Sequence, residues 1–361
     1  MTQSLEQAVI DSLKAYPEPY LGRDLWSCGA IDKLQVVDGR VILNVLLGFP
    51  ALRYATELQA RLVEVVLAVP QVRDADVEIR WQVMAHGGKG SLQPLKQIKN
   101  IIAVASGKGG VGKSTTAVNL ALGLAHEGAA VGILDADIYG PSQPRMLGLD
   151  NERPSSRDGK TIQPPEAYGV KLMSIGLLID AEQPMVWRGP MVTQALNQLL
   201  TETQWGELDY LIIDMPPGTG DTQLTLSQRV PLSGAVIVTT PQDIALLDAR
   251  KGLKMFQKVD VPVLGVVENM STHICSQCGH EEHIFGAGGG RRMAEQYAVD
   301  LLGELPLDIR IREQADGGRP TVVAEPDSNL GRAYIDFARR TAARLSLLSA
   351  PTSPTITIEQ S

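Results

Sequence analysis

The stretch of this sequence with the most specific chemistry is the glycine-rich segment GKGGVGKS, which runs from Gly107 to Ser114. It matches the phosphate-binding pattern G-x-x-x-x-G-K-[ST]. Phosphate oxygens need several backbone N–H groups at close range, and glycines permit both that approach and the dihedral angles it requires. We expect Lys113 to contact the β- and γ-phosphates and the Ser114 hydroxyl to ligate Mg²⁺. The residues predicted to bind the nucleotide here are Gly107, Lys108, Gly109, Gly110, Val111, Gly112, Lys113, Ser114 and Thr115.

The flanks of this segment support the same interpretation. A short apolar run from Ile101 to Ala105 predicts a buried strand before it, and an amphipathic run that ends at Gly128 predicts a helix after it. The helix N-terminus would add its partial positive charge to the phosphate site. A chance glycine turn is the alternative, and the order strand, loop, helix argues against it.

Three aspartates follow apolar runs at positions that suit a metal site. Asp135 and Asp137 end the segment VGILDAD, and Asp214 ends LDYLIID. A carboxylate at the tip of a buried strand can hold the shell of a Mg²⁺ ion without carrying charge into the core. The alternative is that these residues only cap helices and turns.

A pair of cysteines, Cys275 and Cys278, has the C-x₂-C spacing that lets two thiolates face one metal. Three interpretations compete. The pair could be a redox dithiol, although no thioredoxin pattern surrounds it. It could bind zinc together with His280 and His283, although so short a span is strained. Alternatively, two copies of the chain could supply four thiolates to one [4Fe–4S] cluster.

The composition restricts the class of protein. The chain has 361 residues, 44% apolar and 20% charged, with a formal net charge of −8 and no long basic run, which argues against nucleic-acid binding. We see no apolar run of membrane-spanning length and no signal-peptide pattern, so we expect a cytoplasmic protein without a membrane partner. Three cysteines do not make a disulfide framework.

The elements that would position these residues fall into two regions. The first, residues 1–85, has a helical pattern at 4–16, a hairpin at 34–47 around Asp38-Gly39, a helix at 53–68 and a strand at 72–81. This order predicts a small α+β domain. Residues 86–98 have the composition of a linker.

The second region, residues 99–348, alternates short apolar runs with helical patterns, which predicts a mostly parallel sheet covered by helices on both faces. The active residues of such a fold collect at the carboxyl ends of the strands. Residues 349–361 are expected to form a disordered tail. The predicted strands are 101–105, 130–134, 170–175, 209–213, 234–239 and 262–267, and the predicted helices are 114–127, 190–203, 221–229, 243–258, 288–298 and 328–348.

The second lysine of GKGGVGKST makes the glycine loop resemble the deviant Walker A motif of the MinD/ParA/NifH, or SIMIBI-type, P-loop ATPases. That resemblance implies that Lys108 reaches the ATP of a partner subunit. It also implies that Asp137 positions the attacking water, and that Asp135 and Asp214 support Mg²⁺. In the MinD-like class an asparagine at the corresponding strand end recognises the adenine base. Here the strand VLGVVEN ends on Asn269, which is therefore the candidate for base recognition. A side-chain amide suits adenine because it offers a donor and an acceptor; the alternative is an asparagine that caps a turn.

The motifs GKGGVGKST, DADIYGPSQPRMLG, DMPPGTGD and VVENMS, taken with the C-x₂-C, resemble the Mrp/ApbC group of iron–sulfur cluster carrier ATPases. The resemblance implies a homodimer that binds a [4Fe–4S] cluster, hydrolyses ATP, and transfers the cluster to apo iron–sulfur proteins, with cluster scaffold proteins as further partners. The rival is a MinD/ParA-type positioning ATPase. That rival would need an amphipathic or basic surface, and the tail SAPTSPTITIEQS is neither.

The segment GRDLWSCGAIDKLQVVDGRV resembles the small iron–sulfur assembly domain of the PaaD type. The family often carries a cysteine in a turn after the hairpin, where this chain has Ala51 and Leu52. Cys28 lies elsewhere, and we interpret it as a buried, small apolar residue.

Overall fold

The computed structural model describes residues 4–87, 95–156, 158–178, 189–275 and 277–349. Most of the predicted linker and all but the first residue of the predicted tail lie outside these ranges. The described chain forms two compact units. The smaller unit includes the chain up to Met84, and the larger consists of Ala85–Ala125 and Ala129–Thr341.

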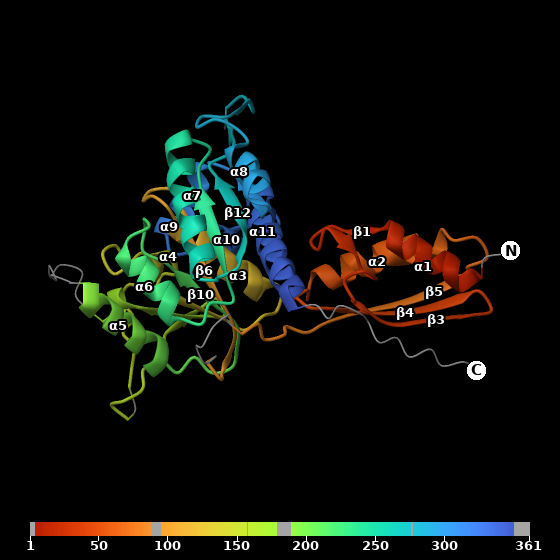
Figure 1. Cartoon of the computed structure of the whole chain (residues 1–361), viewed down its shortest axis with the longest axis horizontal. Coiled ribbons are helices and arrows are strands. Elements are labelled where there is room, and N and C mark those ends of the chain that lie inside the picture. Colours follow the sequence, from red (N-terminus) through yellow and green to blue (C-terminus); the bar gives the residue numbers. More distant parts are fainter. Residues whose placement is uncertain (1–3, 88–94, 157, 179–188, 276, 350–361) are drawn as a thin grey trace. The chain divides into compact units, whose positions relative to one another are not determined.

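The smaller unit is a three-stranded sheet with two helices on one face (Figure 1). Asp38 and Gly39 both have positive φ, 50° and 80°, which is the backbone of the two-residue turn that their sequence predicts. The predicted order of helix, two strands, helix and strand is confirmed, and a short additional hairpin, β1–β2, was not predicted. The elements are α1 (Leu5–Ala15), β1 (Pro17–Glu18), β2 (Arg23–Asp24), β3 (Ile31–Val37), β4 (Arg40–Leu47), α2 (Tyr54–Leu67) and β5 (Asp74–Trp81).

Buried and more exposed side chains alternate along β4, and the buried ones form the core of this unit. The apolar residues at every second position of β4 are fully buried, and α2 buries one stripe of its own against the sheet. Strand β3 pairs with β4 in antiparallel register and β5 pairs with β4 in parallel register. The buried residues of this core include Val41, Leu43, Val45, Leu47, Leu58, Leu62 and Val66.

The larger unit is built on an eight-stranded sheet in the order β15-β12-β11-β6-β10-β7-β9-β8, and only the pairing of β8 with β9 is antiparallel. The predicted mostly parallel sheet is therefore confirmed. The sequence did not predict β15 or the short β8. The strands are β6 (Ile98–Ser106), β7 (Val131–Asp135), β8 (Glu166–Ala167), β9 (Val170–Ser174), β10 (Leu208–Asp214), β11 (Gly234–Thr239), β12 (Val263–Asn269) and β15 (Asp300–Leu305).

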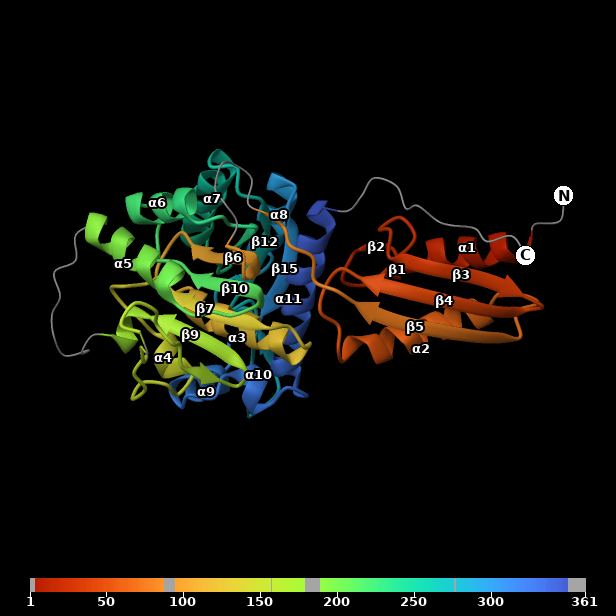
Figure 2. The same ribbon diagram turned by 90° about the horizontal axis from the view of Figure 1, so that it is seen from below.

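Helices cover both faces of this sheet (Figures 1 and 2). One face carries α5 (Gly189–Glu202), α6 (Asp221–Arg229), α7 (Asp243–Lys258) and α8 (Gly289–Tyr297). The other carries α3 (Lys113–His126), α4 (Gln143–Met146), α9 (Ile309–Asp316), α10 (Thr321–Ala324) and α11 (Asn329–Ser346). Two short 3₁₀ turns, Ile175–Leu177 and Leu347–Ser349, complete the helical elements. Among the described helices, none combines the length and the apolar composition that crossing a lipid bilayer requires.

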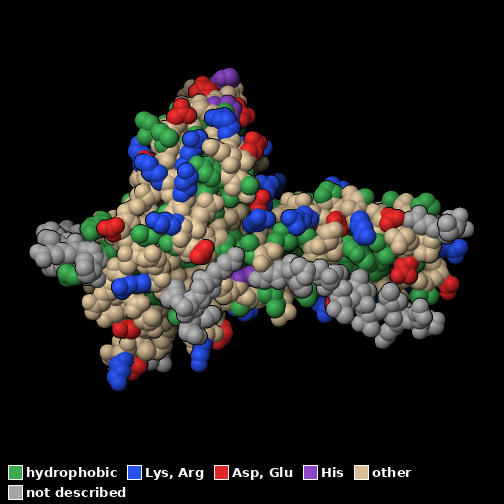
Figure 3. All heavy atoms as spheres, in the orientation of Figure 1, with side chains coloured by type: hydrophobic (Ala, Val, Ile, Leu, Met, Phe, Trp, Pro, Cys, Tyr) green, Lys and Arg blue, Asp and Glu red, His purple; other side chains and the backbone are tan. Residues whose placement is uncertain are grey.

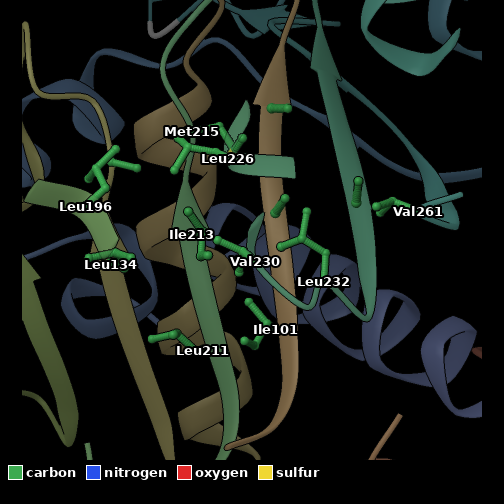
Figure 4. Packing of buried hydrophobic residues seen from close by; sticks show 14 of the residues in the cluster. Ile101, Leu134, Leu196, Leu211, Ile213, Met215, Leu226, Val230, Leu232 and Val261 are labelled. Atoms are coloured by element: carbon green, nitrogen blue, oxygen red, sulfur yellow. The ribbon is translucent and has the colours of Figure 1, made fainter. Parts of the chain in front are cut away.

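The packing between the sheet and α5–α7 forms one buried hydrophobic cluster (Figure 4). Alternate residues of β6, β7 and β10 belong to this cluster, among them Ile101, Leu134 and Leu211, together with Leu196 of α5 and Leu226 of α6. Figure 4 shows Leu134 near Leu196, and Met215 near Leu226. On the opposite face, a Cβ atom at Gly123 of α3 would lie 2.7 Å from that of Ala338, so α3 and α11 pack closely. Buried on both faces, the strands read as nearly continuous apolar runs.

This topology fixes where the polar residues meet. Strand β6 lies in the middle of the sheet with β10 and then β7 on one side and β11 and then β12 on the other. Asp214 at the end of β10 is level with Asp135 at the end of β7 and with Val104 of β6. The predicted acidic positions therefore lie at the same edge of the sheet as the glycine loop that follows β6.

Candidate functional site

The glycine loop joins β6 to α3, and its glycines are required for two different reasons. Gly110 and Gly112 have φ values of 82° and 83°, in the left-handed region that side chains disfavour. Gly107 is required by a close approach, because a Cβ atom there would lie 2.1 Å from the backbone carbonyl carbon of Asp248 in α7. The loop therefore has the backbone shape that phosphate binding needs.

Lys113, the first residue of α3, is the centre of the site. Its ammonium group donates to the carboxylate of Asp214, and its Nζ lies 3.3 Å from Ser114 Oγ and 3.9 Å from Asp137 Oδ2. Only 6% of the side chain is exposed. The structure thus brings together four predicted residues from three strand ends, and phosphate oxygens would have to compete with Asp214 for Lys113.

Asp135 is fully buried and is held by four donors. The N–H groups of Asp137, Ser142 and Gln143 donate to its carboxylate over 3.2, 3.1 and 3.2 Å, and Ser174 Oγ donates over 3.2 Å. Burial raises its pKa, and the nearby charge of Asp214 adds to that rise. Such a carboxylate needs further positive charge to remain ionised.

Asp137 lies at the mouth of the same site, with 15% of its side chain exposed. Burial raises its pKa, although the charge of Lys113 acts in the opposite direction. The hydroxyl of Ser114 and the carboxylates of Asp135, Asp137 and Asp214 are all hard oxygen donors, which suit Mg²⁺. Since no three acidic, histidine or cysteine side chains of the described chain are grouped to ligate one ion directly, these atoms fit Mg²⁺ that is held largely through its own water shell.

Gln143 belongs to this site but was not predicted as a site residue. Its fully buried side-chain Nε2 donates to Asp214 Oδ2 over 2.8 Å and to the Ser114 carbonyl oxygen over 3.0 Å. It begins α4, directly after the turn that follows β7. The motif DADIYGPSQ contains it, but a glutamine in a turn carries no chemical pattern of its own.

Asn269, at the end of β12, lies against the glycine loop. Its Nδ2 donates to the carbonyl oxygen of Val111 over 2.9 Å, and a Cβ atom at Gly112 would lie 2.1 Å from that nitrogen. The residue therefore lies against the glycine loop and supports it directly, a contact that the sequence did not predict. Its predicted contact with adenine stays a prediction.

Lys108 differs from Lys113 in its surroundings. Its side chain is exposed, and within the described part of the chain no carboxylate lies within ion-pair distance of it. Its backbone carbonyl accepts from Ser106 Oγ over 2.9 Å, which fixes the loop while the side chain extends into solvent.

The cysteine pair lies in a small hairpin that follows β12, formed by β13 (His273–Ile274) and β14 (Glu281–Glu282). The Cys275 N–H donates to the His280 carbonyl oxygen, and the Gly279 N–H donates to that of Cys275, both over 2.9 Å. Cys278 is exposed and Cys275 partly so. Histidine and charged side chains gather at this end of the larger unit (Figure 3).

The turn itself favours a thiolate at Cys275. The backbone N–H groups of Cys278 and Gln277, followed by the Cys278 thiol, lower the pKa of Cys275 because they donate toward its sulfur. The thiolate is the form of cysteine that binds metals.

The structure does not assemble the zinc tetrad that the sequence left open. His283 Nδ1 lies 2.8 Å from the Ser271 carbonyl oxygen. Among the described residues, no three histidine, cysteine or acidic side chains are grouped so that they could hold one ion. The cysteine hairpin of one described chain therefore presents two thiol groups without further ligands at that turn.

Cys28 lies in the smaller unit, in the turn after β2. Its side chain is only partly buried, so the prediction of a buried residue was wrong. The backbone of this turn is held by a hydrogen bond from the Cys28 N–H to the Asp24 carbonyl oxygen over 3.2 Å. Burial of its thiol is still sufficient to raise its pKa.

Comparison with known proteins identifies the family of this chain. A family model described as NUBPL iron-transfer P-loop NTPase matches residues 97–342, and one described as iron–sulfur cluster assembly protein matches residues 6–79. The chain is 49% identical to the iron–sulfur cluster carrier protein of Escherichia coli K12, over 95% of this chain and 93% of that protein. It is 51% identical to the mouse iron–sulfur cluster transfer protein NUBPL, over 74% of this chain and 83% of that one.

Solved structures resemble the larger unit. A nucleotide-binding protein from Archaeoglobus fulgidus, determined in complex with ADP, is 39% identical with a TM-score of 0.58, and the match covers 65% of this chain and 92% of that one. The cell-division ATPase MinD of Pyrococcus furiosus, 23% identical with a TM-score of 0.51 over 67% of this chain and 97% of that one, shares the fold. The chain described here therefore belongs to the Mrp/ApbC family of iron–sulfur cluster carrier proteins, with a P-loop NTPase unit of the NUBPL iron-transfer type.

Proposed function

We propose that this protein is an ATPase that carries a [4Fe–4S] cluster between two copies of its chain and transfers the cluster to apo iron–sulfur proteins. The observation that carries the proposal is the cysteine hairpin. It presents Cys275 and Cys278 at an exposed turn without a third ligand among the described residues. A cubane cluster takes four thiolates, so two such turns would complete its ligand set.

The exposed surface of the hairpin supports pairing with a second copy. Ile274 and Ile284 are 55% and 52% exposed, and they flank the cysteines on either side. Two apolar side chains this exposed, on either side of the cysteines, would be removed from water in a dimer that paired the two hairpins. A thiolate-bound cluster also needs a reducing compartment, so we place this function in the cytoplasm.

The ATPase part of the proposal rests on the strand-end site. When bound, Mg²⁺ would offset the charge of the phosphates, and Ser114, Asp135 and Asp214 are the residues that would hold it and its hydration shell. Lys113 would exchange its bond to Asp214 for one to the β- and γ-phosphates. Asp137, at the mouth of the site, would orient the attacking water, while Lys108 would reach the nucleotide of the second copy. Asn269 would recognise adenine.

The proximity of the two sites in the chain suggests how they communicate. Asn269 contacts the glycine loop, and its neighbour Glu268 accepts hydrogen bonds from the N–H groups of Gly288 and Gly290 at the start of α8. The cysteine hairpin lies between these anchors, so the end of β12 joins the nucleotide site to both ends of the hairpin. A shift of the glycine loop when nucleotide binds would therefore displace the hairpin that carries Cys275 and Cys278.

The decisive experiment is anaerobic reconstitution of the full chain with iron and sulfide, followed by native mass spectrometry. We expect one [4Fe–4S] cluster per dimer in the wild type and in Cys28→Ser, and none in Cys275→Ser or Cys278→Ser. Transfer to an apo iron–sulfur enzyme should follow the same pattern. One zinc ion per monomer, lost in His280→Ala or His283→Ala, would overturn the bridging cluster in favour of a zinc site. An internal disulfide with no bound metal would favour the redox dithiol.

A further inference from the structure

The side chain of Gln143 has an unused hydrogen-bonding atom inside the nucleotide site. Its Oε1 is buried and has no hydrogen-bond partner among the described residues, while its Nε2 donates to both Asp214 and Ser114. A buried amide oxygen without a partner costs about 1–3 kcal/mol, so such atoms are rare in folded proteins. A bound ligand that donates a hydrogen bond to this oxygen would account for its position.

The orientation of the amide is determined by its surroundings. Both partners of the nitrogen, a carboxylate oxygen and a backbone carbonyl oxygen, only accept hydrogen bonds. Rotating the amide by half a turn would set the oxygen against two acceptors. The nitrogen thus stays bonded to Ser114 and Asp214, two of the residues that fit Mg²⁺. The oxygen shares an amide carbon with that nitrogen, so it lies in the same buried part of the site.

We propose that Gln143 is a positioning residue for Mg²⁺: its Oε1 accepts a hydrogen bond from the hydration shell of the ion, while its Nε2 holds Ser114 and Asp214 in place. This inference rests on the proposed function, since it concerns the ion that accompanies ATP. Mg²⁺ dehydrates reluctantly and keeps several waters in protein sites. Those waters are donors that need acceptors, and the unpartnered oxygen supplies one.

The two contacts of the amide nitrogen add a second role. They connect α3, through the Ser114 carbonyl, to the end of β10, through Asp214, and these residues are 29 and 71 positions away from Gln143 in the chain. Outer-shell partners of this kind orient the groups that bind a metal, and their loss typically lowers metal affinity by about 10- to 100-fold.

The test is a calorimetric titration of Mg²⁺ into the complex of the full-length protein with ADP, together with ADP titrations in excess EDTA. We expect Gln143→Leu to weaken Mg²⁺ binding by about tenfold or more and to leave the affinity for ADP in EDTA nearly unchanged. Gln143→Asn keeps an amide but withdraws its oxygen from the site, so it should show the same loss, and it decides the question if the leucine variant does not fold.

Gln314→Leu is the matched control. Gln314 of α9 also has a buried oxygen without a partner among the described residues and a nitrogen that donates to a carboxylate, that of Glu325, over 2.6 Å. This control should bind Mg²⁺ as the wild type does.

Unchanged Mg²⁺ affinity in the Gln143 variants would overturn the inference, and so would a parallel loss of ADP affinity with and without Mg²⁺, because that would indicate a packing role. Either result leaves the proposed ATPase intact. If the wild type itself bound ADP without any effect of Mg²⁺, the ATPase part of the proposed function would fail instead.

Discussion

At the scale of single residues, the two lysines of the glycine loop have opposite environments. Lys113 is buried beside Asp214, whereas Lys108 is exposed and extends into solvent. We predict that Lys113→Ala abolishes ATP hydrolysis because the phosphate charge loses its main partner. Lys108→Ala should lower turnover while nucleotide binding remains, since its proposed partner is the ATP of the second copy. Turnover measurements alongside ADP titrations test this, and an equal loss of binding in both variants would argue against the role across the dimer.

Asp137 permits a more conservative test of the chemistry. Converting it to asparagine keeps the shape of the side chain and removes the charge that would orient the attacking water. We expect ATP turnover to fall by about 10²- to 10⁴-fold, as is typical when such a group is lost, with ATP still bound. Single-turnover kinetics provide the measurement. If turnover is unaffected, another residue must orient the water.

At the scale of elements, the glycine loop depends on its fit against β12. Gly112 has a positive φ and lies against the Asn269 amide, so Gly112→Ala combines backbone strain with a steric clash. We expect this variant to lose measurable ADP binding in calorimetry.

Gly169→Ala separates the backbone strain from the steric clash, because only the strain is present at Gly169. Gly169 has a φ of 76° but open space where a Cβ would lie. Its substitution should cost about 1–2 kcal/mol of unfolding free energy from strain alone and leave ADP binding intact. Equal ADP binding by both variants would show that contact with Asn269 does not constrain the loop.

At the scale of the whole molecule, the proposed cluster site requires two chains. We predict that Ile274→Glu and Ile284→Glu weaken the dimer that forms on reconstitution and lower its cluster content, because each places a charge in the covered surface. Leu67→Glu, on the smaller unit, is the control, since Leu67 is a similarly exposed apolar residue at 45%. Analytical ultracentrifugation and iron analysis give the readout. Full cluster content in a monomeric Ile284→Glu variant would contradict a bridging cluster.

Several parts of this protein were predictable because their information is local. The order of strand, glycine loop and helix, the hairpin turn at Asp38-Gly39 and the aspartates at strand ends all follow from neighbouring residues, and the structure confirms each of these elements. Parallel strands bring their carboxyl ends to one edge, so the meeting of Asp135 with Asp214 followed once the alternation of elements was recognised.

Other features were decided by contacts between distant parts of the chain. Strand β15 has little alternation of its own and forms because it pairs with β12, with Gly303 within it packed against Phe337 of α11. The short helices α4, α9 and α10 are likewise formed by packing, since four to eight residues carry too little periodic pattern.

What the sequence determined by itself is the chemistry, namely a phosphate loop, three carboxylates and two thiolates, because these depend on residue type and spacing. What only the tertiary structure decided is which atoms share a site and how they are used. Gln143 bonds to residues far away in the chain, Asn269 supports the glycine loop, and Cys28 stays near the surface. The physical reason is that burial and hydrogen-bond partners are properties of the packed chain, and no local pattern encodes them.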